Sequence, residues 1–92
     1  MKYMLDTHVL LWTIFDSYKL SPSAQRVILD KDIHKFISIS SIWEISIKNR
    51  IGKLPLPDGV AGVFSEVEMS GFGIVNINQE CLEIFSTLPL LH

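Results

Sequence analysis

The sequence has little cysteine, no long hydrophobic run and no excess of basic charge. The single cysteine, Cys81, excludes an internal disulfide and fits a reducing cytoplasm. No apolar run reaches the roughly 18 residues that cross a bilayer. Asp6 also interrupts the apolar start, which argues against a signal peptide. A net charge of −2 argues against a broad basic surface for nucleic acid, but it leaves room for an enzyme that holds a phosphate through a metal.

Hydrophobic residues, by contrast, are abundant. The chain has 92 residues, enough for one small domain, and 48% of them are hydrophobic. A domain of this size buries only roughly 60–65% of its unfolded surface. We therefore expect apolar faces that seek partners.

Strand and helix patterns alternate along the chain. The sequence predicts strands at 2–5, 35–39 and 72–77. It predicts helices at 7–15, from Ser21-Pro22 to about residue 30, at 41–51, at 59–70 and from Asn78 to about residue 85. This order indicates an α/β domain whose parallel sheet has three strands and about five helices.

Two acids follow predicted strands in matching positions. Asp6 comes directly after the first strand, and Glu44 lies near the start of the helix after the second. The carboxyl ends of parallel strands share one edge of a sheet, where ligands bind in open α/β folds. We expect these carboxylates to approach each other as a divalent metal site, with hydroxyls from Thr7, Ser40 and Ser41 nearby.

Each acid also has a purely structural interpretation. Asp6 is a good helix N-cap, and Ser41-x-x-Glu44 matches a capping box. Trp12 and Trp43 lie in apolar helical settings that favour core packing over base stacking. The spacing of His8 and His34 is not that of zinc ligands.

Three separated segments resemble the PIN-domain ribonucleases, specifically the VapC-like toxins of type II toxin–antitoxin pairs. They are Met1 to Trp12, with Asp6-Thr7-His8 at its centre; Ser40 to Pro57, with Trp43-Glu44 and Gly52-Lys53-Leu54; and Leu88 to His92. They occur in the family's order, and the resemblance covers essentially the whole chain. It implies a PIN-like three-layer fold and a single, partial PIN domain at 1–92.

The resemblance also implies an activity, a cofactor and partners. The family members are endoribonucleases that use Mg²⁺ or Mn²⁺ held by usually four acids, and Asp6 and Glu44 match the first two. The third and fourth acids are expected after His92, as are the fourth and fifth strands, so the first strand should lose a neighbour. The implied partners are RNA, a cognate antitoxin and a second copy of the chain, in the cytoplasm and without a membrane.

Three hypotheses remain open at this point. The chain could be a metal-dependent endoribonuclease toxin whose activity is weak or absent in this 92-residue form. It could be a non-catalytic remnant that binds an antitoxin or dimerises. It could also be a small α/β domain with well-capped helices and no site.

Overall fold

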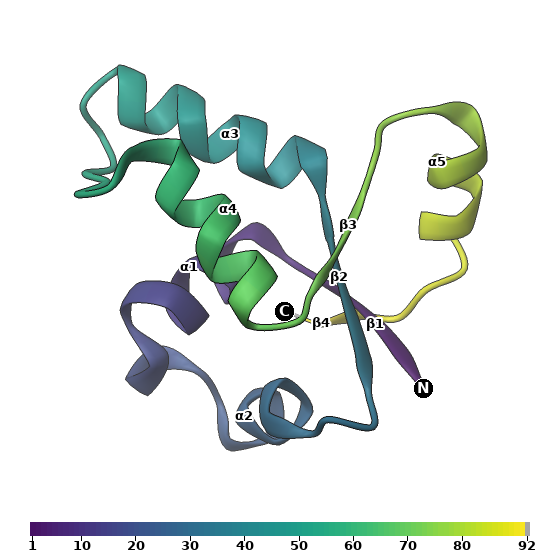
Figure 1. The fold of residues 1–92 in the computed structure, drawn as a ribbon. Helices are drawn as coiled ribbons and strands as arrows, with labels where there is room; N and C mark the ends of the chain where they lie inside the picture. Colours follow the sequence, from purple (N-terminus) through teal and green to yellow (C-terminus); the bar gives the residue numbers. More distant parts are fainter. Residues whose placement is uncertain (92) are drawn as a thin grey trace.

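The computed structural model describes residues 1–91. Its central element is a four-stranded parallel sheet. The strands lie in the order β3-β2-β1-β4. Their bounds are β1 Lys2–Leu5, β2 His34–Ser38, β3 Gly73–Val75 and β4 Leu90–Leu91. The predicted α/β class with a parallel sheet is confirmed, and β1 is a central strand (Figure 1).

The fourth strand corrects the expectation of a three-stranded sheet with one side of β1 uncovered. Leu90 and Leu91 pair in parallel with Met4 and Leu5. The amide of Met4 donates to the Pro89 carbonyl at 2.9 Å, and the amide of Asp6 donates to the Leu91 carbonyl at 3.0 Å. Both neighbours of β1 are therefore present within the described residues. His92, the last residue of the motif at 88–92, lies outside them.

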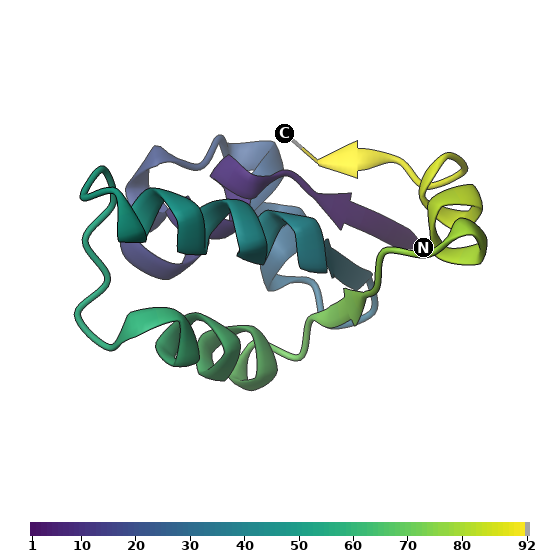
Figure 2. The same cartoon turned by 90° about the horizontal axis from the view of Figure 1, so that it is seen from above.

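Five α-helices connect the described strands. The observed bounds are α1 Thr7–Phe15, α2 Pro22–Leu29, α3 Ile39–Arg50, α4 Gly59–Met69 and α5 Gln79–Phe85, with a short 3-10 helix, η1, at Ser17–Lys19. Right-handed crossovers in this strand order place α1 to α4 on one face of the sheet and α5 on the other. Figures 1 and 2 show this three-layer arrangement.

The principal core lies between the sheet and the layer of α1 to α4. Its fully buried side chains come from β1, β2 and these helices: Leu5, Val9, Leu10, Ile37, Ile42, Ile45, Val63 and Val67. Trp12 packs against the edge of this core. Trp43 does not, because 64% of it is exposed, so the prediction that it packs in the core is wrong.

The opposite face of the sheet is thinly covered. Helix α5 buries none of its residues, and Leu82 and Ile84 are each about half exposed. Cys81 is only partly buried on this helix. No helix within residues 1–91 has both the length and the apolar character that crossing a membrane requires.

A buried lysine joins α2 to β2, a feature the sequence analysis did not identify. Lys35 is only 8% exposed. Its Nζ donates to the carbonyls of Ile28 at 2.9 Å and Asp30 at 2.8 Å, at the carboxyl end of α2. Burial lowers the pKa of Lys35, and the nearby Asp30 carboxylate opposes that shift.

Candidate metal centre

The candidate centre lies where β1 and β2 end and their helices begin. Asp6 follows β1 directly and is the N-cap residue of α1, and Glu44 lies on α3, which follows β2 without a loop. The two strands are parallel neighbours, so their carboxyl ends share one edge of the sheet. The sequence analysis predicted this shared edge, and the topology confirms it.

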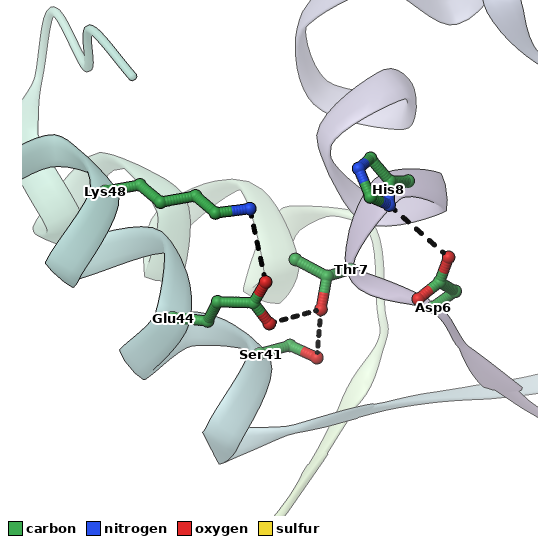
Figure 3. Close-up of polar contacts among 6 residues, drawn as sticks. All are labelled: Asp6, Thr7, His8, Ser41, Glu44 and Lys48. Carbon is green, nitrogen blue, oxygen red and sulfur yellow. Dashed lines mark hydrogen bonds and ion pairs between the residues drawn. The ribbon is translucent and has the colours of Figure 1, made fainter. Parts of the chain in front are cut away.

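Thr7 joins the two strand ends. Its hydroxyl donates to Ser41 Oγ at 2.8 Å in a buried hydrogen bond, and it lies 3.4 Å from Glu44 Oε2 (Figure 3). These contacts span 34 and 37 residues of sequence. Thr7 therefore fixes the first turn of α1 against α3 and orients Glu44.

The Asp6 carboxylate is not used to cap its helix. Asp6 has the extended backbone of an N-cap residue, but its side chain makes no capping hydrogen bond. Its Oδ2 lies 3.7 Å from His8 Nδ1, and the side chain is 37% exposed. Asp6 thus occupies the N-cap position that the capping interpretation predicts. Its carboxylate oxygens are not used for capping and are available to a ligand.

The proposed capping box at Ser41 and Glu44 is wrong. Helix α3 begins at Ile39, and its N-cap is Ser38, whose Oγ accepts from the Ser40 amide at 3.1 Å. Glu44 lies beyond the first turn, where no free amide needs its carboxylate. Its Oε1 instead pairs with Lys48 Nζ at 3.2 Å.

The supporting serines differ in position. Ser41 is buried against Thr7, whereas Ser40 is exposed and its Oγ lies 2.6 Å from Ser38 Oγ. Ser38 was not identified from the sequence because it was assigned to the interior of a strand. If the start of α3 had been predicted at Ile39, Ser38 would have been recognised as the last residue of β2 and the N-cap of that helix.

A hollow of about 340 Å³ opens beside these residues. Asp6, Thr7, Ser38, Ser40 and Ser41 form its polar side. Its apolar side comes from β1, α5, the segment before β4 and β4 itself: Met4, Leu5, Leu82, Phe85, Leu88 and Leu90. Glu44 is not part of its lining. In Figure 3, Asp6 and Glu44 lie on opposite sides of Thr7, so the two acids flank this hydroxyl and do not face each other directly.

The donor set suits a hard divalent cation but is small. It consists of two carboxylates and nearby hydroxyls, the oxygen ligands that Mg²⁺ and Mn²⁺ prefer. No cluster of three or more acidic, histidine or cysteine side chains suited to a metal occurs within residues 1–91. A cation here would keep most of its water ligands.

Comparisons with known proteins neither support nor contradict the resemblance to PIN domains. No protein-family model, no curated protein and no solved structure matches the chain.

Proposed function

We propose that the edge formed by Asp6 and Glu44 is part of the metal site of a cytoplasmic endoribonuclease of the PIN-domain, VapC-like toxin type. The proposal includes Mg²⁺ or Mn²⁺ as cofactor, RNA as substrate and an antitoxin protein as partner. With two acids at the edge, we expect the 92-residue chain to cleave RNA weakly.

One observation carries this proposal. Asp6 lies at the end of β1, Glu44 lies on the second turn of α3 after the neighbouring strand β2, and neither carboxylate caps a helix. Thr7, between them, contacts both Glu44 and Ser41 through its hydroxyl. If these acids served only to cap helices, their oxygens would accept hydrogen bonds from backbone amides at the helix N-termini.

The protein groups at this edge have distinct roles in the proposal. Asp6 and Glu44 would ligate the cation, while Thr7, whose hydroxyl donates to Ser41, contacts Glu44 and holds it in place. A bound divalent cation would activate water and offset charge on the attacked phosphate. Lys48 offsets the charge of Glu44, so the ion must compete with this lysine for the carboxylate.

A non-catalytic binding module is the second candidate. Its support is the exposed apolar surface, because α5 buries no residue and Trp43 is 64% exposed. Such surfaces are typical of protein–protein contacts. In this alternative, the chain would bind an antitoxin or a second copy without cleaving RNA.

An RNA cleavage assay separates the two candidates. We would incubate excess purified chain with structured and unstructured RNA in Mn²⁺, in Mg²⁺ and in chelator. We expect weak, metal-dependent cleavage that both Asp6→Asn and Glu44→Gln reduce at least about tenfold, since each variant removes one of two charged ligands.

Glu68→Gln is the matched control because Glu68 is an exposed acid on α4, away from the strand ends. It should leave cleavage unchanged. Equal activity in all three variants would show that cleavage does not come from this edge. Absence of any metal-dependent cleavage would favour the binding module.

A further inference from the structure

Lys48 brings a positive charge to the candidate metal centre. Its Nζ lies 3.2 Å from Glu44 Oε1, whereas Glu44 Oε2 faces the Thr7 hydroxyl at 3.4 Å (Figure 3). Among residues 1–91, Glu44 is the only acid with which Lys48 forms an ion pair. An ammonium has three N–H donors, and one carboxylate oxygen occupies one of them. Lys48 can therefore take a further acceptor.

The pair between Glu44 and Lys48 also has a purely structural interpretation. The two residues are four apart on α3, a spacing that favours ion pairs on helix surfaces, and Lys48 lies in the last turn, where the helix dipole favours a cation. The side chains of Glu44 and Lys48 are 51% and 39% exposed. Exposed pairs of this kind contribute little stability, so Glu44 can exchange Lys48 for a stronger partner.

The charge at this edge gives Lys48 a second role. Asp6 and Glu44 carry two negative charges, so a divalent cation held by both would leave a neutral site if Lys48 were absent. With Lys48, the loaded site has one net positive charge, which matches one phosphodiester. The whole chain has a net charge of −2, so its attraction for a phosphate must come from local positive charge.

We propose that Lys48 binds a phosphate of the RNA substrate, and that it moves from Glu44 to this phosphate when Glu44 becomes a ligand of the cation. This inference rests on the proposed function and names the residue that attracts the substrate. Lysine suits the role because its ammonium is a point charge on a flexible stem. Since the metal-free chain pairs Lys48 with Glu44, metal binding and RNA binding strengthen each other.

Arg50 provides a matched control on the same helix. It is exposed and has no ion pair among residues 1–91. It follows Lys48 by two residues, which is about 200° around the helix axis, so it lies on the side of α3 turned away from Lys48. Lys48→Met and Arg50→Met each remove one positive charge and keep an aliphatic stem.

The first measurement is the affinity for Mn²⁺, followed by NMR line broadening in the ¹⁵N-labelled chain. We expect Lys48→Met to bind Mn²⁺ about threefold more tightly than the parent, because no ammonium competes for Glu44 Oε1. Arg50→Met should bind Mn²⁺ with nearly the affinity of the parent.

The second measurement is the affinity for a short fluorescent single-stranded RNA, by anisotropy, with Mn²⁺ saturating each variant and again in chelator. Mn²⁺ should strengthen RNA binding by the parent and by Arg50→Met, and Lys48→Met should lose most of this gain. In Mn²⁺, the slope of log affinity against log salt should be shallower by about 0.7 in Lys48→Met, the contribution of one phosphate contact with a single strand. Lys48→Arg keeps the charge and should keep the slope of the parent.

The two measurements distinguish failure of this inference from failure of the proposed function. If Mn²⁺ does not bind near residues 6–8 and 40–44 of the parent, the proposed function and the role of Lys48 are both overturned. If Mn²⁺ binds there but Lys48→Met has the RNA affinity and salt slope of the parent, only the role of Lys48 is overturned. An equal loss of slope in Arg50→Met would also overturn that role, because the attraction would then come from positive charge in general.

Discussion

Thr7 links the two halves of the candidate site at the scale of single residues. The sequence alone indicated Asp6, Thr7 and Glu44, because carboxylates and hydroxyls at strand ends form a recognisable pattern. It did not indicate that Thr7 would lie between the acids and hydrogen-bond to Ser41, since that contact joins residues 34 apart. Contacts between residues so far apart in the sequence depend on how the strands pair, and no local sequence pattern specifies that pairing.

Thr7→Val should destabilise the chain by about 1–2 kcal/mol, since it deprives the buried Ser41 hydroxyl of its partner while preserving shape. Urea unfolding followed by circular dichroism measures the change. Thr13→Val is the matched control, because the Thr13 hydroxyl only donates to a carbonyl within its own helix, at Val9. An equal loss in both variants would mean that the link between α1 and α3 adds no stability.

Lys35→Met should lower the free energy of unfolding by about 1–3 kcal/mol at neutral pH, because two carbonyls at the end of α2 lose a charged donor. Urea denaturation of the variant and the parent chain gives the difference. Exposed Lys31→Met, in the turn after α2, should have little effect.

The same lysine should make stability depend on pH. Burial lowers the pKa of Lys35 from 10.5, so the unfolded chain binds this proton more tightly than the folded chain. The free energy of unfolding contributed by Lys35 should therefore rise with pH between the lowered pKa and 10.5. Urea unfolding across this window should show a steeper rise for the parent than for Lys35→Met. Parallel pH profiles would contradict the assignment.

At the scale of elements, helix positions were largely predictable and their starts less so. Ser21, Asn78 and the glycines after α3 and α4 marked helix ends correctly, since Ser21 and Asn78 accept capping hydrogen bonds and Gly52 and Gly71 have positive φ. The start of α3 was misplaced because Ser38, Ser40 and Ser41 are all good caps. Only the backbone conformation shows that Ser38 has this role.

Ser38→Ala should cost about 1 kcal/mol, because it leaves the Ser40 amide at the start of α3 without its acceptor. Ser46→Ala, in the interior of the same helix, should be neutral or slightly stabilising, since alanine is the better helix former. Thermal melts compare the two variants directly. A larger loss for Ser46→Ala would contradict the observed helix start.

At the scale of the whole molecule, the alternation of strands and helices was sufficient to predict a parallel sheet and its layers. It was not sufficient to predict β4, because two leucines after a proline form too short a run for any periodicity. Because of this strand, β1 is paired on both sides, so an uncovered edge of β1 does not lower the stability of the domain. Exposed apolar side chains remain on several elements, including α3 and α5, and they are the reason to expect a partner.

Addition of Mn²⁺ to the ¹⁵N-labelled chain, followed by NMR, tests the central claim most directly. The claim is that Asp6 and Glu44 form one cation site at the shared strand edge. A paramagnetic ion broadens the signals of amides near it, so residues 6–8 and 40–44 should broaden first and together, and Asp6→Asn should abolish the effect at both segments. Broadening that begins at Asp30 and Asp32, or at only one of the two segments, would contradict the shared site.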